Sequence, residues 1–156
     1  MKIISLLDTD NINPEKLSQL NSTKTFSFDI LSHKLLESKN LRHYLTDDFL
    51  SYEERKKIFD HVVSKLYWYD NQTFSKESTI DSTNVFEFLD PLYLHQKLIV
   101  TLTNFLIIKK IIETEKPQKI FLTKNLSKIV STINNQIPLV YLNSDEIEIF
   151  DTFDLK

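Results

Sequence analysis

QKIFLTKNLSKIVSTINNQIPLVYL, residues Gln118 to Leu142, is the stretch that decides the fold class. Its first six residues, QKIFLT, contain the apolar run IFL, and its last six, IPLVYL, are apolar throughout, which predicts strands over Gln118–Thr123 and Ile137–Leu142. Between them, Asn125–Asn134 predicts a helix with a single apolar face, made of Leu126, Ile129, Val130 and Ile133. A strand, a helix and a second strand are typical of a parallel βαβ unit, whose crossover is right-handed in nearly all proteins.

The preceding sequence repeats this alternation of strands and helices. Strands are expected at Lys2–Leu7, Lys24–Ile30 and, with a weaker pattern, Leu41–Leu45. Helices are expected at Asn13–Leu20, Ser32–Ser38, Ser51–Tyr69 and Pro91–Glu115. This order of elements predicts an α/β fold, a Rossmann-like sandwich in which helices flank a central, mostly parallel sheet of about five strands.

Residues 1–150 are expected to form one domain. A chain of 156 residues can bury a core of its own without disulfides. The polar segment Asn71–Asn84 is expected to be a loop, and Glu146–Phe150 alternates like an edge strand. The tail Asp151–Lys156 is polar and is expected to fray.

Composition excludes several classes of function. Without Cys there are no disulfides, no thiolate chemistry and no zinc sites that need thiolates. The net charge of −3, without a strong basic run, argues against a nucleic-acid partner. The apolar runs are too short or too interrupted for a signal peptide or a transmembrane segment, so we expect a cytoplasmic protein.

The sequence contains neither Gly nor Ala, which is consistent with the A- and T-rich codons of a low-GC genome. Backbone positions with positive φ must then be taken by residues such as Asn, and Asn40 stands where a C-cap Gly would usually follow the helix Ser32–Ser38. Gly-rich phosphate-binding turns are excluded, because only Gly lets the backbone approach a pyrophosphate closely. We therefore expect no cofactor.

In an open α/β sheet, ligands bind beyond the carboxyl ends of the strands. The polar residues expected there are Asp8, Asp10, Asn11, Asp29, Ser32, His33, Asp47, Asp48, Thr123, Lys124, Asn125, Asn143 and Asp145. Most such residues are helix caps or turn formers. His33 is the candidate general acid or base, because it stands at a helix start beside this crevice, whereas we expect His61 to be solvated and His95 to lie in the core.

Asp8 and Asp10 follow the first strand with one residue between them. Two carboxylates in this position could bind Mg²⁺, and Asp8 could act as a nucleophile. The pattern resembles the first motif of haloacid-dehalogenase-type phosphatases, and the strand ending in Thr123 loosely resembles their second motif. The later Lys and acidic pair of that family are missing, so a simple turn into the next helix is the alternative, and no metal is assigned.

Two apolar surfaces are open to a structural or a functional interpretation. The predicted helix Ser51–Tyr69 ends in three aromatic residues, Tyr67, Trp68 and Tyr69, and helical spacing turns one or two of them outward. These side chains could stack on a sugar, bind a protein partner or pack under the next loop. The middle of Pro91–Glu115 is apolar nearly all round, so this helix is either buried on several sides or binds a partner. The second case would make the chain a stand-alone protein-interaction module.

Phe26–Tyr69 and Ile111–Thr123, the second with the run EKPQKI, resemble the N-terminal half of surface-polysaccharide glycosyltransferases of archaea and bacteria. These are similar to GT-B enzymes, in which two Rossmann-like halves face a cleft. The resemblance implies an acceptor-side domain that is inactive without a second, donor-binding α/β domain or a protein partner, and whose acceptor is a glycan or a lipid-linked sugar. By position it places Asp8, Asp10, His33 and Asn125 at the cleft.

From these arguments we assign candidate roles to six residues. His33 and Asp8 are the catalytic candidates, and the substrate-binding candidates are Asp10, Asn125, Trp68 and Tyr69.

Overall fold

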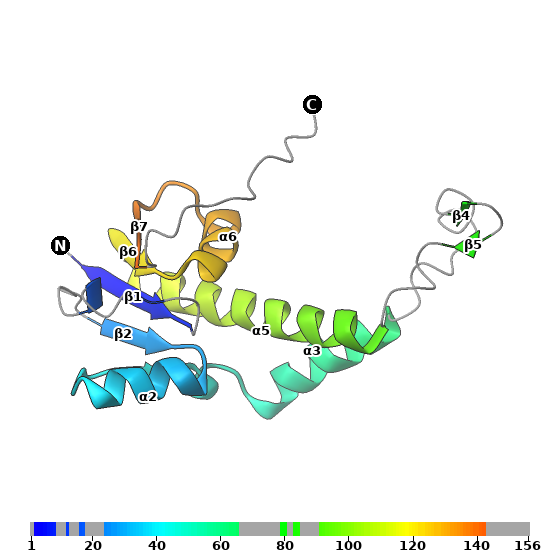
Figure 1. Cartoon of the computed structure of the whole chain (residues 1–156), viewed down its shortest axis with the longest axis horizontal. Helices are drawn as coiled ribbons and strands as arrows, with labels where there is room; N and C mark the ends of the chain where they lie inside the picture. The colour runs from blue at the N-terminus through cyan, green and yellow to red at the C-terminus, as the bar shows by residue number, and fades with distance from the viewer. Residues whose placement is uncertain are drawn as a thin grey trace. The chain divides into compact units, whose positions relative to one another are not determined.

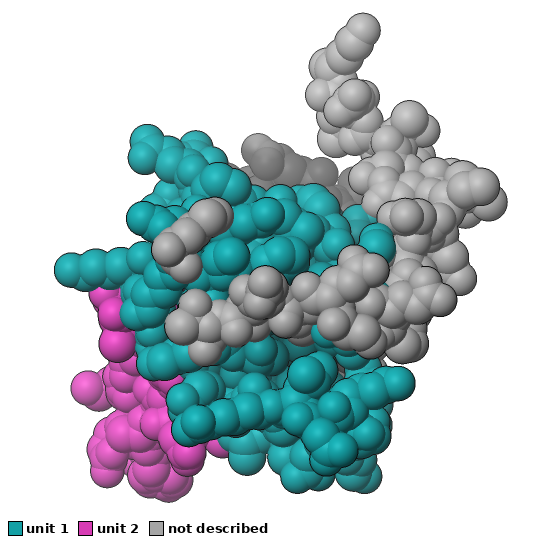
Figure 2. All heavy atoms as spheres, turned by 90° about the vertical axis from the view of Figure 1, so that its left-hand side faces the viewer, with its two compact units in different colours: residues 1–45, 115–156 teal, residues 46–114 magenta. Residues whose placement is uncertain are grey.

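The computed structural model describes residues 2–8, 12, 16–17, 24–65, 79–80, 83–84 and 91–142 (Figure 1). The chain divides into two compact units, residues 1–45 with 115–156 and residues 46–114 (Figure 2). The predictions for Asp10, for Trp68 and Tyr69, for most of the helix Asn13–Leu20 and for everything after Leu142 lie outside the described residues. A single domain over residues 1–150 stays a prediction.

The first unit contains a sheet of five parallel strands in the order β3-β2-β1-β6-β7. The strands are β1 (Ile3–Leu7), β2 (Lys24–Ser27), β3 (Tyr44–Leu45), β6 (Lys119–Leu122) and β7 (Leu139–Tyr141). The chain first adds strands on one side of β1 and then, from β6 onward, on the other side, which is the order of a Rossmann-like fold. The predicted α/β class, with a mostly parallel sheet of about five strands, is confirmed.

Two described helices of this unit connect neighbouring strands. α2 (Ile30–Ser38) links β2 to β3, and α6 (Lys124–Ile133) links β6 to β7. Figure 1 shows α2 alongside β2 and α6 alongside β6 and β7. The two crossovers run in opposite directions across the sheet, and right-handed crossovers of this kind put their helices on opposite faces.

The core follows from the apolar patterns of these elements. Ile4 and Leu6 of β1 are fully buried, and β6 alternates so that Ile120 and Leu122 are buried. The predicted apolar face of α6 also points inward through Leu126 and Val130. A second cluster gathers Leu7, Leu17, Leu36 and Leu142. Burial of each such side chain contributes about 1.5–3 kcal/mol to folding.

The junction between β2 and α2 lies earlier than predicted. β2 ends at Ser27 rather than Ile30, and α2 begins at Ile30 rather than Ser32. The reason is a capping box, in which the Asp29 carboxylate accepts a hydrogen bond from the Ser32 amide at 2.7 Å and the Ser32 hydroxyl accepts one from the Asp29 amide at 3.4 Å. The predicted third strand likewise shortens to Tyr44–Leu45.

Two helix ends show how a chain without Gly makes left-handed turns. Asn40, just after α2, has a φ of 54°, which confirms that it takes the place of a C-cap Gly. Its neighbour Leu41 closes the helix by donating its amide to the Leu36 carbonyl at 2.9 Å. Lys116 has a φ of 47° directly after α5 (Pro91–Glu115). Lys carries a β-carbon that disfavours this region, so the position stores strain.

The second unit contains η1 (Thr46–Phe49), α3 (Tyr52–Ser64), β4 (Thr79–Ile80), β5 (Thr83–Asn84) and nearly all of α5. The capping box predicted at Ser51 is confirmed, because the Ser51 hydroxyl accepts from the Glu54 amide at 3.2 Å and the Glu54 carboxylate accepts from the Ser51 amide at 2.9 Å. The prediction of a loop over Asn71–Asn84 is wrong where β4 and β5 pair antiparallel. Their β-branched Thr and Ile residues favour extended backbone.

Candidate functional site

The order of the strands selects one position for a binding crevice. β1 and β6 are neighbours, and the chain turns to opposite sides of the sheet after each of them. At such a switch point the connections diverge beyond the carboxyl ends of the strands, which is where open α/β sheets bind ligands. Asp8 directly follows β1, and Thr123 directly follows β6. We therefore take this edge of the first unit as the candidate site.

Asp8 and Thr123 are joined across the switch point. The Asp8 amide donates to the Thr123 hydroxyl at 3.4 Å, and the Thr123 amide donates to the Leu6 carbonyl at 3.3 Å. Thr123 is fully buried and is the N-cap residue of α6, but its hydroxyl makes no capping bond. The hydroxyl instead ties the end of β1 to the start of α6. Asn125 lies in the first turn of this helix with an exposed side chain.

The junction between β1 and β2 is closed by a buried pair of hydroxyls. The Ser27 and Ser32 hydroxyl oxygens lie 2.7 Å apart, and the Ser32 hydroxyl also donates to the Leu7 carbonyl at 3.2 Å. Both side chains are almost fully buried. The Phe28 amide donates to the Leu7 carbonyl at 2.8 Å. Sequence reasoning missed Ser27. The available signal was its small side chain, because in a sequence without Gly or Ala a Ser is the residue that lets a strand end and a helix start approach closely.

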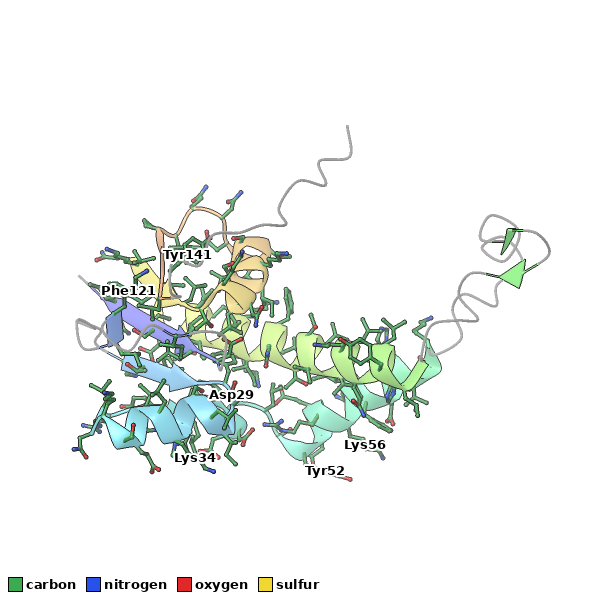
Figure 3. The ribbon with its side chains drawn as sticks, viewed as in Figure 1. Asp29, Lys34, Tyr52, Lys56, Phe121 and Tyr141 are labelled. Carbon is green, nitrogen blue, oxygen red and sulfur yellow. The ribbon has the colours of Figure 1, made fainter. Side chains whose placement is uncertain are left out.

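The Asp29 carboxylate caps the start of α2. One of its oxygens caps the helix through the Ser32 amide, as its position before the helix predicts. Figure 3 marks Asp29 at this end of α2. The general expectation that most polar residues at strand ends are caps holds for Asp29 and Ser32.

His33 contacts a residue of its own helix and one from the segment before β3. Its Nδ1 lies 2.7 Å from His43 Nε2, and its Nε2 lies 3.5 Å from a Glu37 carboxylate oxygen. His43 comes from the segment just before β3, at the outer edge of the sheet. Neither of these contacts involves Asp8, the other catalytic candidate. Sequence reasoning missed His43, because a separation of ten positions between two histidines matches no motif.

The other histidines are placed in the second unit. His61 is exposed on α3, as predicted. His95 on α5 is partly buried, and its ring meets Phe59 edge-on with 5.6 Å between the ring centroids. Its buried Nε2 has no hydrogen-bond partner among the described residues, so it is not the satisfied core histidine that we expected.

A charged cluster stands at the opposite, amino-end edge of the sheet. The buried Glu115 carboxylate lies 2.7 Å from Lys2 Nζ and 2.5 Å from Lys24 Nζ. Hydrogen bonds from Lys2 and Lys24 hold the pKa of Glu115 below its usual value, against the effect of burial. The hydrogen bond to Glu115 raises the pKa of Lys24. Because Lys2 precedes β1 and Lys24 begins β2, this cluster stabilises the sheet and takes no part in the candidate site.

Within the described ranges, no group of three or more His, Cys, Asp or Glu side chains could hold a metal ion. The same ranges contain no helix that is both long and apolar enough to cross a membrane. Comparison with protein-family models, with curated proteins and with solved structures finds no match. The fold and the switch point are therefore the basis for a functional proposal.

Proposed function

We propose that this chain is the acceptor-side domain of a GT-B-like glycosyltransferase for surface polysaccharide or glycan synthesis, completed by a second, donor-binding domain or partner. The observation that carries the proposal is the end of β1. In a dinucleotide-binding Rossmann domain, this is where a Gly-rich turn receives the pyrophosphate. Here the position holds Asp8, whose amide is already bonded to Thr123.

Two physical effects oppose a diphosphate at this edge. The Asp8 carboxylate repels phosphate charge, and a side chain with a β-carbon keeps the backbone from close approach. A neutral ligand rich in hydroxyl groups meets neither obstacle.

A sugar acceptor suits the polar groups at the switch point. Carboxylate oxygens accept hydrogen bonds from hydroxyl groups, and the amide of an Asn side chain both donates and accepts. Asp8 and the exposed Asn125 offer these groups at the ends of adjacent strands. Under this proposal the protein lies in the cytoplasm, and its acceptor is a glycan or a lipid-linked sugar.

Chemical-shift mapping of the ¹⁵N-labelled chain tests this proposal. We expect mono- to tetrasaccharides of hexoses and N-acetylhexosamines to perturb the amides of Asp8, Thr123 and Asn125. Asn125→Ala should weaken the tightest binder about two- to tenfold, the loss of one or two hydrogen bonds. Asn135→Ala is the matched control, because Asn135 is an exposed Asn just beyond the other end of α6. Perturbations confined to the amino-end edge of the sheet would contradict the proposal.

A second candidate function is a stand-alone protein-interaction module. The observation that favours it is the N-terminal half of α5, where Leu92, Tyr93, Leu98 and Val100 are exposed. Light scattering at rising protein concentration tests the homotypic form of this function. A monomer whose mass stays constant up to the millimolar range would argue against self-association through α5.

A phosphatase centred on Asp8 is favoured only by the contact between its amide and the Thr123 hydroxyl. This function requires Mg²⁺-dependent turnover of phosphate esters. Turnover that is lost in Asp8→Asn while the fold stays intact would establish it. Absence of turnover across a broad panel of phosphate esters would remove it.

A further inference from the structure

The His33–His43 pair joins α2 to the segment that leads into β3. His33 Nδ1 and His43 Nε2 lie 2.7 Å apart, and the ring centroids are 4.9 Å apart with an interplanar angle of 58°. The second nitrogen of His43, Nδ1, lies 2.7 Å from the Leu41 carbonyl oxygen. Three of the four ring nitrogens are thus within hydrogen-bond distance of a defined partner.

These contacts determine where the protons must be. A carbonyl oxygen only accepts, so His43 Nδ1 carries a hydrogen. When His43 is neutral, its Nε2 is therefore an acceptor, and His33 Nδ1 is the donor to it. A neutral His33 then has its lone pair on Nε2, the nitrogen that lies 3.5 Å from the Glu37 carboxylate.

Protonation has opposite consequences at the two rings. One added proton fits on His33 Nε2, where it faces Glu37 and leaves the contact with His43 intact. A second proton has only His43 Nε2 to occupy. Two N–H groups would then point at each other across 2.7 Å, between two positive rings.

We propose that the His33–His43 pair is a proton-operated clasp, closed while at most one ring is charged and open when both are charged. Within the described residues, Glu37 on α2 is the charged group in contact with the pair, and it favours the singly charged state. Histidine side chains change their charge between about pH 5 and 8, which sets the pH range over which the clasp is tested.

The element that this clasp holds is β3. That strand has two residues, Tyr44 and Leu45, and it pairs with β2 only through Phe26 and Ser27. Such a short edge strand has little pairing of its own. When the clasp opens, we expect β3 to separate from β2 more often, while β1, β2 and β6 stay paired.

Nuclear magnetic resonance of the whole chain, with EDTA present, tests the proposal in two steps. Long-range ¹H–¹⁵N spectra of the imidazoles at pH 8 should show His43 with its hydrogen on Nδ1. Amide exchange, corrected for the intrinsic effect of pH, should then show protection of the β3 amide that donates to β2 falling about fivefold more than that of Ile4 and Leu6 between pH 8 and 5, as expected for the loss of one hydrogen bond.

His43→Gln should abolish this selective loss of protection, because Gln cannot take up a proton. His61→Gln, which changes an exposed His on α3, is the matched control and should keep it. A hydrogen on Nε2 of His43 at pH 8 would overturn the proposal even if the variant fails to fold. Selective loss of β3 protection that persists in His43→Gln would also overturn the proposal. Imidazole signals that shift when Zn²⁺ replaces EDTA would overturn it too, because they would identify a metal site instead.

Discussion

Ser5 and Ser32 are two buried hydroxyls that should respond in opposite ways to removal. Ser5 stands in the middle of β1 and is fully buried, and its hydroxyl has no hydrogen-bond partner among the described residues. Ser32 is equally buried, but its hydroxyl contacts the Leu7 carbonyl and the hydroxyl of Ser27. Changing each to Ala removes one oxygen atom from nearly the same depth. The difference between the two changes in the free energy of unfolding therefore measures how much hydrogen bonding of a buried hydroxyl contributes to stability in this core.

The magnitudes follow from these contacts. A buried polar group without a partner costs about 1–3 kcal/mol, and loss of one oxygen leaves only a small cavity. Ser5→Ala should therefore increase the free energy of unfolding by about 1 kcal/mol. Ser32→Ala loses two or more hydrogen bonds, including its half of the α2 capping box, and should lower that free energy by about 1–3 kcal/mol.

Urea unfolding monitored by circular dichroism measures both changes. The midpoints should move in opposite directions, while the slope of the free energy against urea stays the same. Destabilisation of 1 kcal/mol or more by Ser5→Ala would refute the reasoning, because it would mean that the Ser5 hydroxyl is hydrogen-bonded. Equal effects of the two substitutions would refute it as well.

Two other predictions concern the end of α5. Lys116→Gly should increase the free energy of unfolding by about 1 kcal/mol, because Gly adopts a positive φ without strain. Asn40→Gly should change that free energy by less, since Asn tolerates this region. A lower free energy of unfolding for Lys116→Gly, measured by urea unfolding, would count against stored strain at this position. Glu115→Gln should lower that free energy by about 1–2 kcal/mol at pH 7, less than for a fully buried pair because Lys2 and Lys24 are partly exposed. The pKa of Glu115 in the folded state lies below 4.5, so the stability that its carboxylate contributes is present above that pH and is lost as the pH falls through the lowered value. Glu115→Gln should therefore lose less stability than the wild type between pH 6 and 3. Equal losses in the two proteins would contradict this prediction.

The class of fold could be predicted because its signals are local. The apolar run of Lys2–Leu7 and the single apolar face of Asn125–Asn134 each indicate their element without knowledge of the rest. The handedness of crossovers then restricts how such elements join. Asn40 was predictable for the same reason, since a helix end that needs a positive φ leaves few choices in a sequence without Gly.

Element boundaries and the details of the site were less predictable, because they depend on contacts between distant segments. Ile30 continues the alternation of β2 but begins α2, since the Asp29 cap outweighs the strand pattern. The position of Asp8 at the end of a central strand was predictable. Its bond to Thr123, 115 residues away, and the pairing of His33 with His43 follow only from the folded chain.

If the switch point binds a sugar acceptor, as we propose, the edge beyond β1 should not receive a diphosphate. Isothermal titration calorimetry of this chain with UDP-, GDP- and dTDP-sugars measures that directly. We predict no binding heat at millimolar ligand, because Asp8 and its bonded amide occupy the place of the phosphate turn. Micromolar binding of any of these nucleotides, abolished by a change at Thr123, would contradict that expectation.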